Sequence, residues 1–333
     1  MVNKTELSSL SEEGGYTPPQ RGLLSLLPSS WVPYAELIRI DKPHGIYLVW
    51  VPHIVGLAYA SAIGPSPAPV RRLCTRALRL MVWAALCRSA GCVWNDTVDQ
   101  DFDRKTVRCR NRPVARGAVT TSQAHIFAAV LFSLAFLSLR GISSNAMSVA
   151  GIVAVLSLVY PFCKRFTSFP QVVLGSSLGL TVVLSAWSLD VDMLEGRNRI
   201  PTICLMLVIV LLIVFYDVVY ATQDTADDVK AGVKGMAVLF RNHLLVLLCT
   251  LVCGIAGVLS TLGILVNMGP QYFVFSVAGL VLGLMVVVGL IYLPFLSRWR
   301  RLSGWVFGFA FASFIGGFSS EHYRRLSLAA QKG

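Results

Sequence analysis

The sequence contains few charged residues for its length. Only 14% of the 333 residues are Asp, Glu, Lys or Arg, and 55% are apolar, whereas a soluble domain carries about 25% charged residues. Seventeen acidic and 29 basic side chains cannot cover the surface of a soluble protein of this size. The shortage argues against a soluble enzyme, a disordered chain and a collagen-like fibre, and it favours a polytopic membrane protein.

Several other patterns are missing. The eight cysteines are scattered without a C-x-x-C pair, which argues against a zinc or iron–sulfur site. The segment 1–42 has no basic stretch before an early apolar run, so no signal peptide is expected, and its acidic residues argue against a mitochondrial transit peptide. No repeated ten-residue alternation of the kind that forms a membrane β-barrel is present.

Long apolar runs, in contrast, are abundant. Nine stretches approach the roughly 20 residues that a helix needs to cross a bilayer: 44–62, 77–94, 124–139, 146–162, 170–188, 201–221, 243–265, 271–295 and 304–320. Pro52 and His53 interrupt the first stretch, which is therefore expected to be kinked or to line a cavity. The sequence predicts an all-helical membrane protein with a polar N-terminal tail (1–42), a transmembrane domain (43–320) and a C-terminal tail (321–333).

The excess of basic residues gives a net charge of +12. Such a balance suggests nucleic acid in a soluble protein, but in a membrane protein Lys and Arg gather in cytosolic loops. With nine spans, most of the basic residues fall on the side that carries the N-terminus. We therefore expect a cytosolic N-terminus, a location in the endoplasmic reticulum or another endomembrane, and no nucleic-acid partner.

Acidic residues form two clusters, each at the end of a predicted helix. The first contains Asp96, Asp99 and Asp103 and begins at Asn95. If the helix continues through this segment, Asn95, Asp99 and Asp103 lie on one face, at i, i+4 and i+8. Like charges at this spacing repel one another, so the cluster requires cations.

The second cluster repeats this arrangement. Asp224 and Asp228 are four residues apart, Asp217 precedes Asp224 by seven residues, and Tyr220 lies one turn before Asp224. An even number of predicted spans separates the two clusters, so both are expected on the same side of the membrane. Asp217 is alternatively explained as a residue that caps or solvates a helix end.

Paired carboxylate clusters suit Mg²⁺, which prefers oxygen ligands and often reaches its substrate through phosphate groups. Nearby basic residues either hold the remaining phosphate oxygens or only mark the cytosolic side. The sequence therefore predicts ionisation of a prenyl diphosphate, with its hydrophobic tail in a cavity within the membrane. Arg88, inside the second span, is either functional or only neutralises the first cluster.

The two clusters resemble the motifs of the UbiA superfamily of intramembrane prenyltransferases. The family's N-D-x-x-D-x-x-x-D motif matches 95–103, and its D-x-x-x-D motif, preceded by Tyr-Ala, matches 220–228. Further strings similar to the family lie at 41–45, 112–117, 160–165 and 232–234. The resemblance covers about residues 36–320.

The resemblance implies nine helices around a central cavity, Mg²⁺ as cofactor and two bound substrates. The residues that it implies for the metal are Asp96, Asp99, Asp103, Asp224 and Asp228. Those implied for the diphosphate are Asn95, Lys105, Arg112, Lys164 and Lys234, and those for the acceptor are Arg88, Lys42 and Tyr220. The proton released in the reaction goes either to Asp217 or to the departing diphosphate; the sequence does not decide between them.

The strings around the motifs, at 31–34, 41–43, 90–96 and 99–103, resemble fungal meroterpenoid prenyltransferases. These enzymes join farnesyl diphosphate to an aromatic polyketide, such as a phenolic acid or a pyrone. The alternatives are a 4-hydroxybenzoate polyprenyltransferase of ubiquinone biosynthesis and, from other classes, a cation transporter or a membrane scaffold. Acidic residues at one interface, rather than at mid-membrane, disfavour the transporter. The sequence indicates no oligomeric state.

Overall fold

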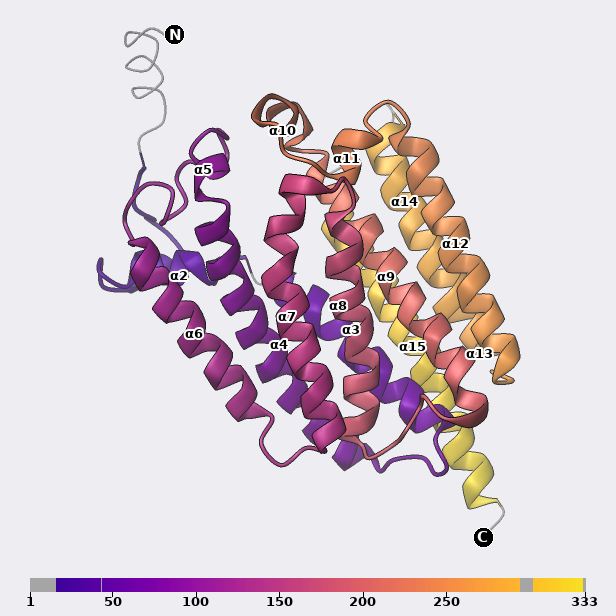
Figure 1. Cartoon of the computed structure of the whole chain (residues 1–333). Coiled ribbons are helices and arrows are strands. Elements are labelled where there is room, and N and C mark those ends of the chain that lie inside the picture. The colour runs from indigo at the N-terminus through magenta and orange to yellow at the C-terminus, as the bar shows by residue number, and fades with distance from the viewer. Residues whose placement is uncertain (1–15, 43, 294–301, 332–333) are drawn as a thin grey trace, which may run out of the picture.

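The structure, a computed structural model, describes residues 16–42, 44–293 and 302–331. Within these ranges every regular element is helical, and the long helices run roughly parallel between two ends of the molecule (Figure 1). The all-helical prediction is therefore confirmed. Residues 1–15 of the predicted tail, Pro43, the last two residues of the span 271–295 and most of the loop that follows it lie outside the described residues.

Each predicted span corresponds to a long helix or helical segment. These are α3 (His44–Ile63), α4 (Val70–Val98), α6 (Thr121–Ser138), α7 (Ser144–Phe166), α8 (Pro170–Ser188), α9 (Arg199–Ala221), α12 (Leu244–Leu265), the segment of α13 (Pro270–Tyr272), η3 (Phe273–Gly279, a π-helix) and α14 (Leu280–Tyr292), and α15 (Ser303–Ala330). Among the described residues, eight of these are long and apolar enough to cross a membrane. Helix α15 is not one of the eight, so the count of nine spans stays a prediction.

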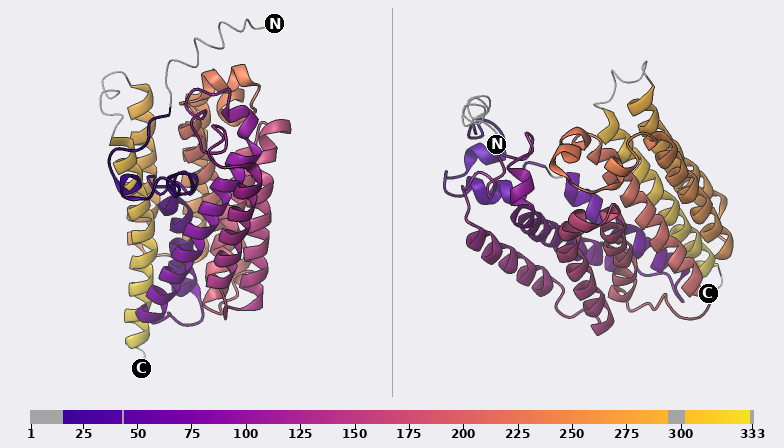
Figure 2. Two further views of the ribbon diagram at one scale, coloured as in Figure 1. Left: turned by 90° about the vertical axis from the view of Figure 1, so that its left-hand side faces the viewer. Right: turned by 45° about the horizontal axis from the view of Figure 1, so that its top comes forward.

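Short helices connect the long ones. They are η1 (Leu23–Leu26), α2 (Val32–Leu37), α5 (Gln100–Asp103), η2 (Gly196–Asn198), α10 (Thr225–Ala231) and α11 (Met236–Leu239). Helices α5 and α10, which belong to the two acidic clusters, lie at the same end of the bundle, and the last turn of α15 lies at the other end (Figure 1). Both views in Figure 2 show the described segment 16–42 beside the end of the bundle that carries α5.

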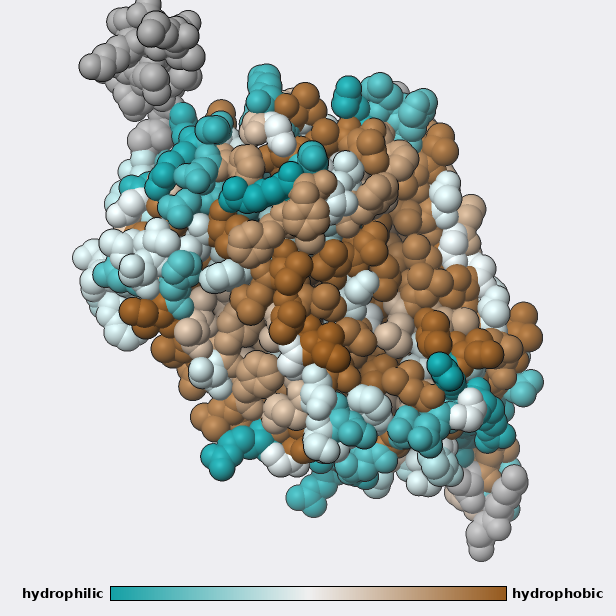
Figure 3. Space-filling view, in the orientation of Figure 1, coloured by the Kyte–Doolittle hydropathy of each residue, from teal (hydrophilic) through white to brown (hydrophobic). Residues whose placement is uncertain are grey.

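The outside of the bundle is apolar. Helix α6 exposes Ile126, Val130, Leu134 and Leu137, three or four residues apart and therefore on one face. Figure 3 shows a broad hydrophobic belt between hydrophilic patches at the two ends. A surface of this kind is stable against lipid chains rather than water, so the chain is a multi-pass membrane protein.

Small residues let the central helices approach one another closely. A Cβ atom on Gly56 of α3 would lie 2.9 Å from the Cα atom of Val182 in α8, and one on Gly175 of α8 would lie 3.0 Å from the carbonyl oxygen of Val210 in α9. Because the obstructing atoms belong to backbone, any side chain here would push the helices apart. These contacts fix α3, α8 and α9 as the interior of the bundle.

Helix α15 continues ten residues past the predicted end of the membrane domain. Its Glu321 is buried, and its carboxylate accepts hydrogen bonds from Arg324 at 2.6 Å, Arg325 at 2.8 Å and the backbone N–H of Gly269 at 3.0 Å. The predicted tail from 321 is therefore helical as far as Ala330, because its polar groups satisfy one another within the bundle.

The π-helix η3 is tied to α15 by two serine hydroxyls. Ser276 Oγ donates to the carbonyl oxygen of Phe314 at 2.6 Å, and Ser313 Oγ donates to that of Phe275 at 2.8 Å. A π-turn leaves carbonyl groups without their usual partners in the helix, and a serine from the neighbouring helix supplies one. The two elements are thus held in register by reciprocal hydrogen bonds.

Replacing Gly56 by alanine is expected to destabilise the bundle by about 1–3 kcal/mol, since the added methyl group overpacks the contact with α8. The measurement is the thermal unfolding midpoint of the purified protein in detergent. Gly257 of α12 is the matched control, because a Cβ there meets nothing within 4 Å. Equal midpoints for Gly56→Ala and Gly257→Ala would contradict the close contact.

Candidate active site

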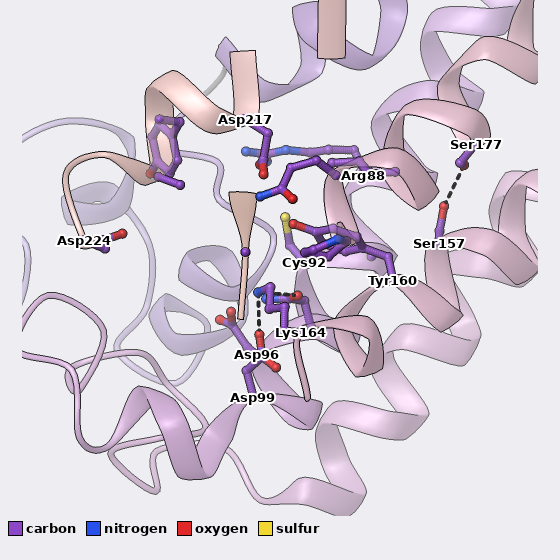
Figure 4. A pocket seen from close by; sticks show the side chains of 18 of the residues that line it. Arg88, Cys92, Asp96, Asp99, Ser157, Tyr160, Lys164, Ser177, Asp217 and Asp224 are labelled. Carbon is purple, nitrogen blue, oxygen red and sulfur yellow. Dashed lines mark hydrogen bonds and ion pairs between the residues drawn. The ribbon is translucent and has the colours of Figure 1, made fainter. Parts of the chain in front are cut away.

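A cavity of about 370 Å³ lies inside the bundle and receives residues from both acidic clusters (Figure 4). The predicted site residues that line it are Arg88, Asn95, Asp96, Asp99, Asp103, Arg112, Lys164, Asp217, Tyr220, Asp224, Asp228 and Lys234. Lys42 and Lys105 are exposed and are not part of the lining. The structure thus brings together all but two of the predicted residues.

The first cluster is not a continuous helix. Helix α4 ends at Val98, and α5 restarts at Gln100. Helical hydrogen bonds nevertheless continue across the break, from Asp99 N–H to the Asn95 carbonyl at 2.8 Å and from Asp103 N–H to the Asp99 carbonyl at 2.9 Å. The expected shared face is therefore kept, although the uninterrupted helix that the sequence suggested is wrong.

Basic side chains neutralise the carboxylates of the first cluster. Asp96 is buried and pairs with Arg39 at 2.6 Å and with Arg112 at 3.2 Å. The same Arg112 nitrogen lies 2.9 Å from Asp103. One guanidinium thus bridges two acidic residues of the cluster, which offsets their mutual repulsion in a poorly hydrated place.

Asp99 has a separate partner. Lys164, near the end of α7, donates to Asp99 Oδ2 at 2.7 Å and lies 3.5 Å from the side-chain oxygen of Asn95. Its ammonium is 5.5 Å from the centre of the Tyr160 ring. Tyr160 also lines the cavity, so α7 contributes both a charge and an aromatic face to the site.

The second cluster is linked to the first by Arg108. Its guanidinium makes a two-point contact with the carboxylate of Asp224, in which Nε lies 2.6 Å from Oδ1, and it donates to the Tyr220 hydroxyl at 3.0 Å. Such a two-point pair is the strongest geometry available to arginine and a carboxylate. The loop after α5 is therefore fastened to the end of α9.

Burial changes the acidity of the carboxyl groups in the loops. The pKa of Asp103 is raised to about 6, mainly because the group is buried and also because Asp96 is near, although Arg112 opposes the rise. Burial and the neighbouring Asp224 raise the pKa of Asp228 as well. Both groups hold a negative charge less readily than a solvated aspartate, which favours a cation beside them.

Arg88 lines the cavity, and both of its terminal nitrogens donate to backbone carbonyl oxygens. It donates to the carbonyl oxygens of Ile38 at 2.8 Å, Arg39 at 3.3 Å and Lys42 at 3.1 Å. A Cβ on Gly45 would lie 2.6 Å from the guanidinium. Arg88 therefore holds the segment 38–42 against the bundle, a role that the sequence did not suggest.

The segment before α3 is a structural part of the site. Arg39 has a left-handed backbone (φ 57°), which is uncommon outside glycine. Glu36 pairs with Arg116 at 2.6 Å and accepts a hydrogen bond from the Tyr16 hydroxyl at 2.8 Å. These contacts hold Arg39 over Asp96, so the region predicted as a polar tail closes one side of the first cluster.

The donor set suits a hard divalent cation. Asp96 Oδ2 and Asp99 Oδ1 are buried without a hydrogen-bond partner in the described part of the chain. Unpaired carboxylate oxygens are the ligands that Mg²⁺ prefers. Within the described residues no three His, Cys, Asp or Glu side chains stand close enough to hold a metal ion.

The sequence did not reveal Arg39 as part of the cavity wall or Asp224 as the partner of Arg108. Arg39 and Arg108 are 57 and 116 residues from the aspartates that they contact, so no helical spacing relates them. His53 is also buried in the wall. Its position beside Pro52 in an apolar span was the one signal, since that interruption predicted a kinked or cavity-lining helix.

Residues 49–316 match a family model, that of the UbiA prenyltransferase family. The chain belongs to this family. The UbiA match and the curated relatives make it a prenyl-transferring enzyme. It is 50% identical to prenyltransferase ascA of Acremonium egyptiacum (94% of this chain and 92% of that one) and 47% identical to prenyltransferase stbC of Stachybotrys bisbyi (95% and 96%). It is also 40% identical to the DMOA farnesyltransferase nvfB of Aspergillus novofumigatus (77% and 80%).

Solved structures share the UbiA fold. The apo UbiA homologue from Aeropyrum pernix superposes with a TM-score of 0.66 at 20% identity and covers 81% of this chain and 97% of its own. The Archaeoglobus fulgidus homologue bound to GPP and Mg²⁺ gives 0.57 at 18% identity, with 87% and 99% covered. At this identity the likeness concerns the fold.

In this UbiA enzyme, Arg88→Ala is expected to release the segment 38–42, because the carbonyl oxygens there lose their shared donor. Amide hydrogen exchange of that segment should accelerate about tenfold or more, which corresponds to the loss of one or two hydrogen bonds. Arg79→Ala is the control, since Arg79 lies on the same helix and donates to the carbonyls of Ser138 and Arg140. Unchanged exchange at 38–42 in Arg88→Ala would contradict this role.

Proposed function

We propose that this enzyme transfers a prenyl group, farnesyl in preference to other lengths, from its diphosphate to a ring carbon of an aromatic polyketide. The observation that carries the proposal is the convergence of both acidic clusters and six lysine and arginine side chains on one cavity within the membrane. Carboxylates and bases at one place are needed to hold a diphosphate, and an apolar cavity is needed to hold its tail.

The diphosphate would lie between the clusters. Lys164 and Arg112 are placed to bind its oxygens, because each already holds a carboxylate oxygen of the first cluster. Asn95 and Lys234 also line this part of the cavity. Lys105, which the sequence also suggested, does not belong to the proposed group because it lies outside the lining.

The proposed ligands of Mg²⁺ are Asp96, Asp99 and Asp103 from the first cluster, with Asp224 and Asp228 from the second. Bound Mg²⁺ would supply positive charge to the departing diphosphate. The Archaeoglobus homologue with GPP and Mg²⁺ supports this cofactor for the family. In this chain, the two unpaired oxygens of Asp96 and Asp99 support it independently.

The protein's own contribution is to hold the substrates and exclude water. Ionisation of the allylic C–O bond leaves a carbocation, which water would quench, and the aromatic rings of Trp83 and Tyr160 line the cavity. The electron-rich ring carbon attacks this cation and then loses a proton. Asp217, which lines the same cavity, and the released diphosphate are the two candidate proton acceptors.

The aromatic substrate would bind on the side of Arg88 and Tyr220. A carboxylate on that substrate would compete with the carbonyl groups of 38–42 for Arg88, so its binding would be coupled to this segment. Lys42 is exposed, and we leave it out of the proposed site.

The fungal relatives, including a farnesyltransferase, favour a polyketide over 4-hydroxybenzoate as the substrate. The family match also favours prenyl transfer over cation transport. We propose a catalytic domain longer than the transmembrane domain predicted over 43–320, because Arg39 lines the cavity and α15 runs to Ala330.

The proposal includes a location in the endoplasmic reticulum or another endomembrane and an N-terminus on the cytosolic side. The distribution of basic residues supports the cytosolic side. Protection of an N-terminal tag from protease in sealed microsomes would contradict it.

Asp96→Asn and Asp224→Asn are each expected to lower Mg²⁺-dependent product formation by about a hundredfold or more, since each removes a carboxylate charge proposed to hold the Mg²⁺ that stabilises the departing diphosphate. Asp101→Asn and Asp227→Asn are matched controls, because they lie within the same two clusters but do not line the cavity. Normal turnover in either of the first pair would contradict the metal assignment.

The substrate class is tested in microsomes with geranyl, farnesyl and geranylgeranyl diphosphates against phenolic acids, pyrones and 4-hydroxybenzoate. We expect the largest yield from farnesyl diphosphate with a phenolic acid or pyrone, by mass spectrometry, and none when EDTA replaces Mg²⁺. Preference for 4-hydroxybenzoate would favour the ubiquinone alternative. Activity in EDTA would contradict the proposal that Mg²⁺ is the cofactor.

A further inference from the structure

His53 of α3 presents an unsatisfied polar atom in the wall of the cavity. Its side chain is fully buried, and it is one of the lining residues. Nδ1 lies 2.9 Å from Ser185 Oγ on α8, whereas Nε2 has no hydrogen-bond partner in the part of the chain that the structure describes. Leaving such an atom unpaired is costly, so its position in a substrate cavity points to a ligand.

The partner of Nδ1 decides which ring nitrogen carries the hydrogen. Ser185 Oγ donates its own hydrogen to the carbonyl oxygen of Thr181 at 2.7 Å. Ser185 Oγ therefore accepts from His53, and Nδ1 is the donor. No described acidic side chain pairs with the ring, so a buried positive charge would be unfavourable and the imidazole is neutral. Nε2 consequently offers a lone pair and no hydrogen.

Three hydroxyl groups in the same wall also donate their hydrogens to backbone carbonyl oxygens. Thr181 Oγ1 donates to the Leu178 carbonyl at 2.6 Å. Ser157 and Ser177 donate to the Val153 carbonyl at 2.8 and 3.1 Å, and the two hydroxyls lie 3.3 Å apart. We refer to His53, Ser157, Ser177 and Thr181, all of which line the cavity, as the lone-pair wall.

The lone-pair wall lies away from the charged end of the site. Figure 4 shows Ser157 and Ser177 at the right of the view, Asp224 at the left, and Asp96 and Asp99 below the centre. Residues 177, 181 and 185 recur every four positions on α8, so they share one face of that helix. Among the described residues of this wall, only His53 keeps a buried polar atom without a partner, and such a group within a membrane-spanning helix is costly unless a ligand uses it.

The chemistry of the wall selects what can lie against it. An isoprenoid chain has no hydrogen to donate and would leave Nε2 unpaired. A carboxylate or carbonyl oxygen would place lone pairs against lone pairs. A hydroxyl group supplies the missing hydrogen, and on an aromatic ring it does so from a flat group that fits between helices.

We infer that the lone-pair wall binds a ring hydroxyl of the aromatic substrate, which donates its hydrogen to His53 Nε2. The inference rests on the proposed function and refines it, because it makes His53 a specificity-determining residue for phenolic substrates. A substrate with a free hydroxyl at that position should be preferred over its methyl ether, since the ether has no hydrogen to offer.

The test compares kcat/KM for a dihydroxybenzoic acid substrate and for each of its mono-O-methyl ethers, with farnesyl diphosphate and Mg²⁺. In the wild type, we expect one ether to be a poorer substrate by about 10- to 100-fold. His53→Phe should lose this discrimination, because the free phenol falls to the level of the ether. His53→Gln should retain part of it, since the amide oxygen still accepts a hydrogen bond.

His322→Phe is the matched control. His322 is also buried, its Nδ1 lies 3.0 Å from Ser61 Oγ and its Nε2 is likewise unpaired among the described residues, but it does not line the cavity. Its replacement should change stability without changing the ratio between phenol and ether. A merely structural role of His53 would produce that same result.

Three outcomes would overturn the inference. A folded His53→Phe variant that keeps the wild-type ratio excludes His53 as the partner. If the wild-type enzyme does not prefer the free phenol over the methyl ether at any position, no ring hydroxyl binds Nε2, and an ordered water is its partner. This outcome does not depend on the folding of any variant. If the wild type prenylates other substrates but no aromatic one, the proposed function fails together with the inference.

Discussion

Carboxylates gathered at one end of a membrane-embedded cavity repel each other and lose hydration, and the rest of the site is arranged around this cost. Arg112 joins Asp96 to Asp103, Lys164 neutralises Asp99, and Arg108 holds Asp224. Each partner comes from a loop or helix different from that of its aspartate. Neutralisation therefore also fastens the ends of α4, α7 and α9 to one another, so that the charge balance and the shape of the cavity depend on the same contacts.

The cavity has two chemically opposite parts. One end presents charges and unpaired carboxylate oxygens, and the lone-pair wall presents neutral acceptors within the spanning helices. In the proposed function, a charged diphosphate and a phenolic ring would find different partners in one enclosure, and this separation would orient the two substrates toward each other.

The sequence predicted the helices well because apolar runs of bilayer length leave few alternatives. It placed the start of α4 too late, at 77 rather than Val70, because Arg71, Arg72 and Arg76 lie outside the apolar window although the helix continues through them. Likewise, it ended the last helix before Glu321, whose charge is satisfied by arginines of the next turn. The polar residues in the sequence predicted where the apolar spans end, whereas hydrogen bonds determine where the helices themselves end.

The site was predicted to a similar extent. Both acidic clusters have fixed spacing and were found directly, but Arg39 and Arg108 reach their partners only through the folded chain. Arg88 was expected to face a substrate, and its contacts with the carbonyls of Ile38 and Lys42 depend on how the segment before α3 folds against the bundle. Long-range partners of this kind have no periodicity, so spacing alone cannot find them.

The close contact at Gly56 has a consequence for how this enzyme can change during evolution. Gly56 lies one helical turn after His53, and a side chain there would meet Val182 and Ser185 on α8. Any larger residue would move α3 away from α8 and separate His53 from the serine that fixes its tautomer. Substitutions at positions 53, 56 and 185 are therefore coupled, because a change at one of them alters the contact that the other two make.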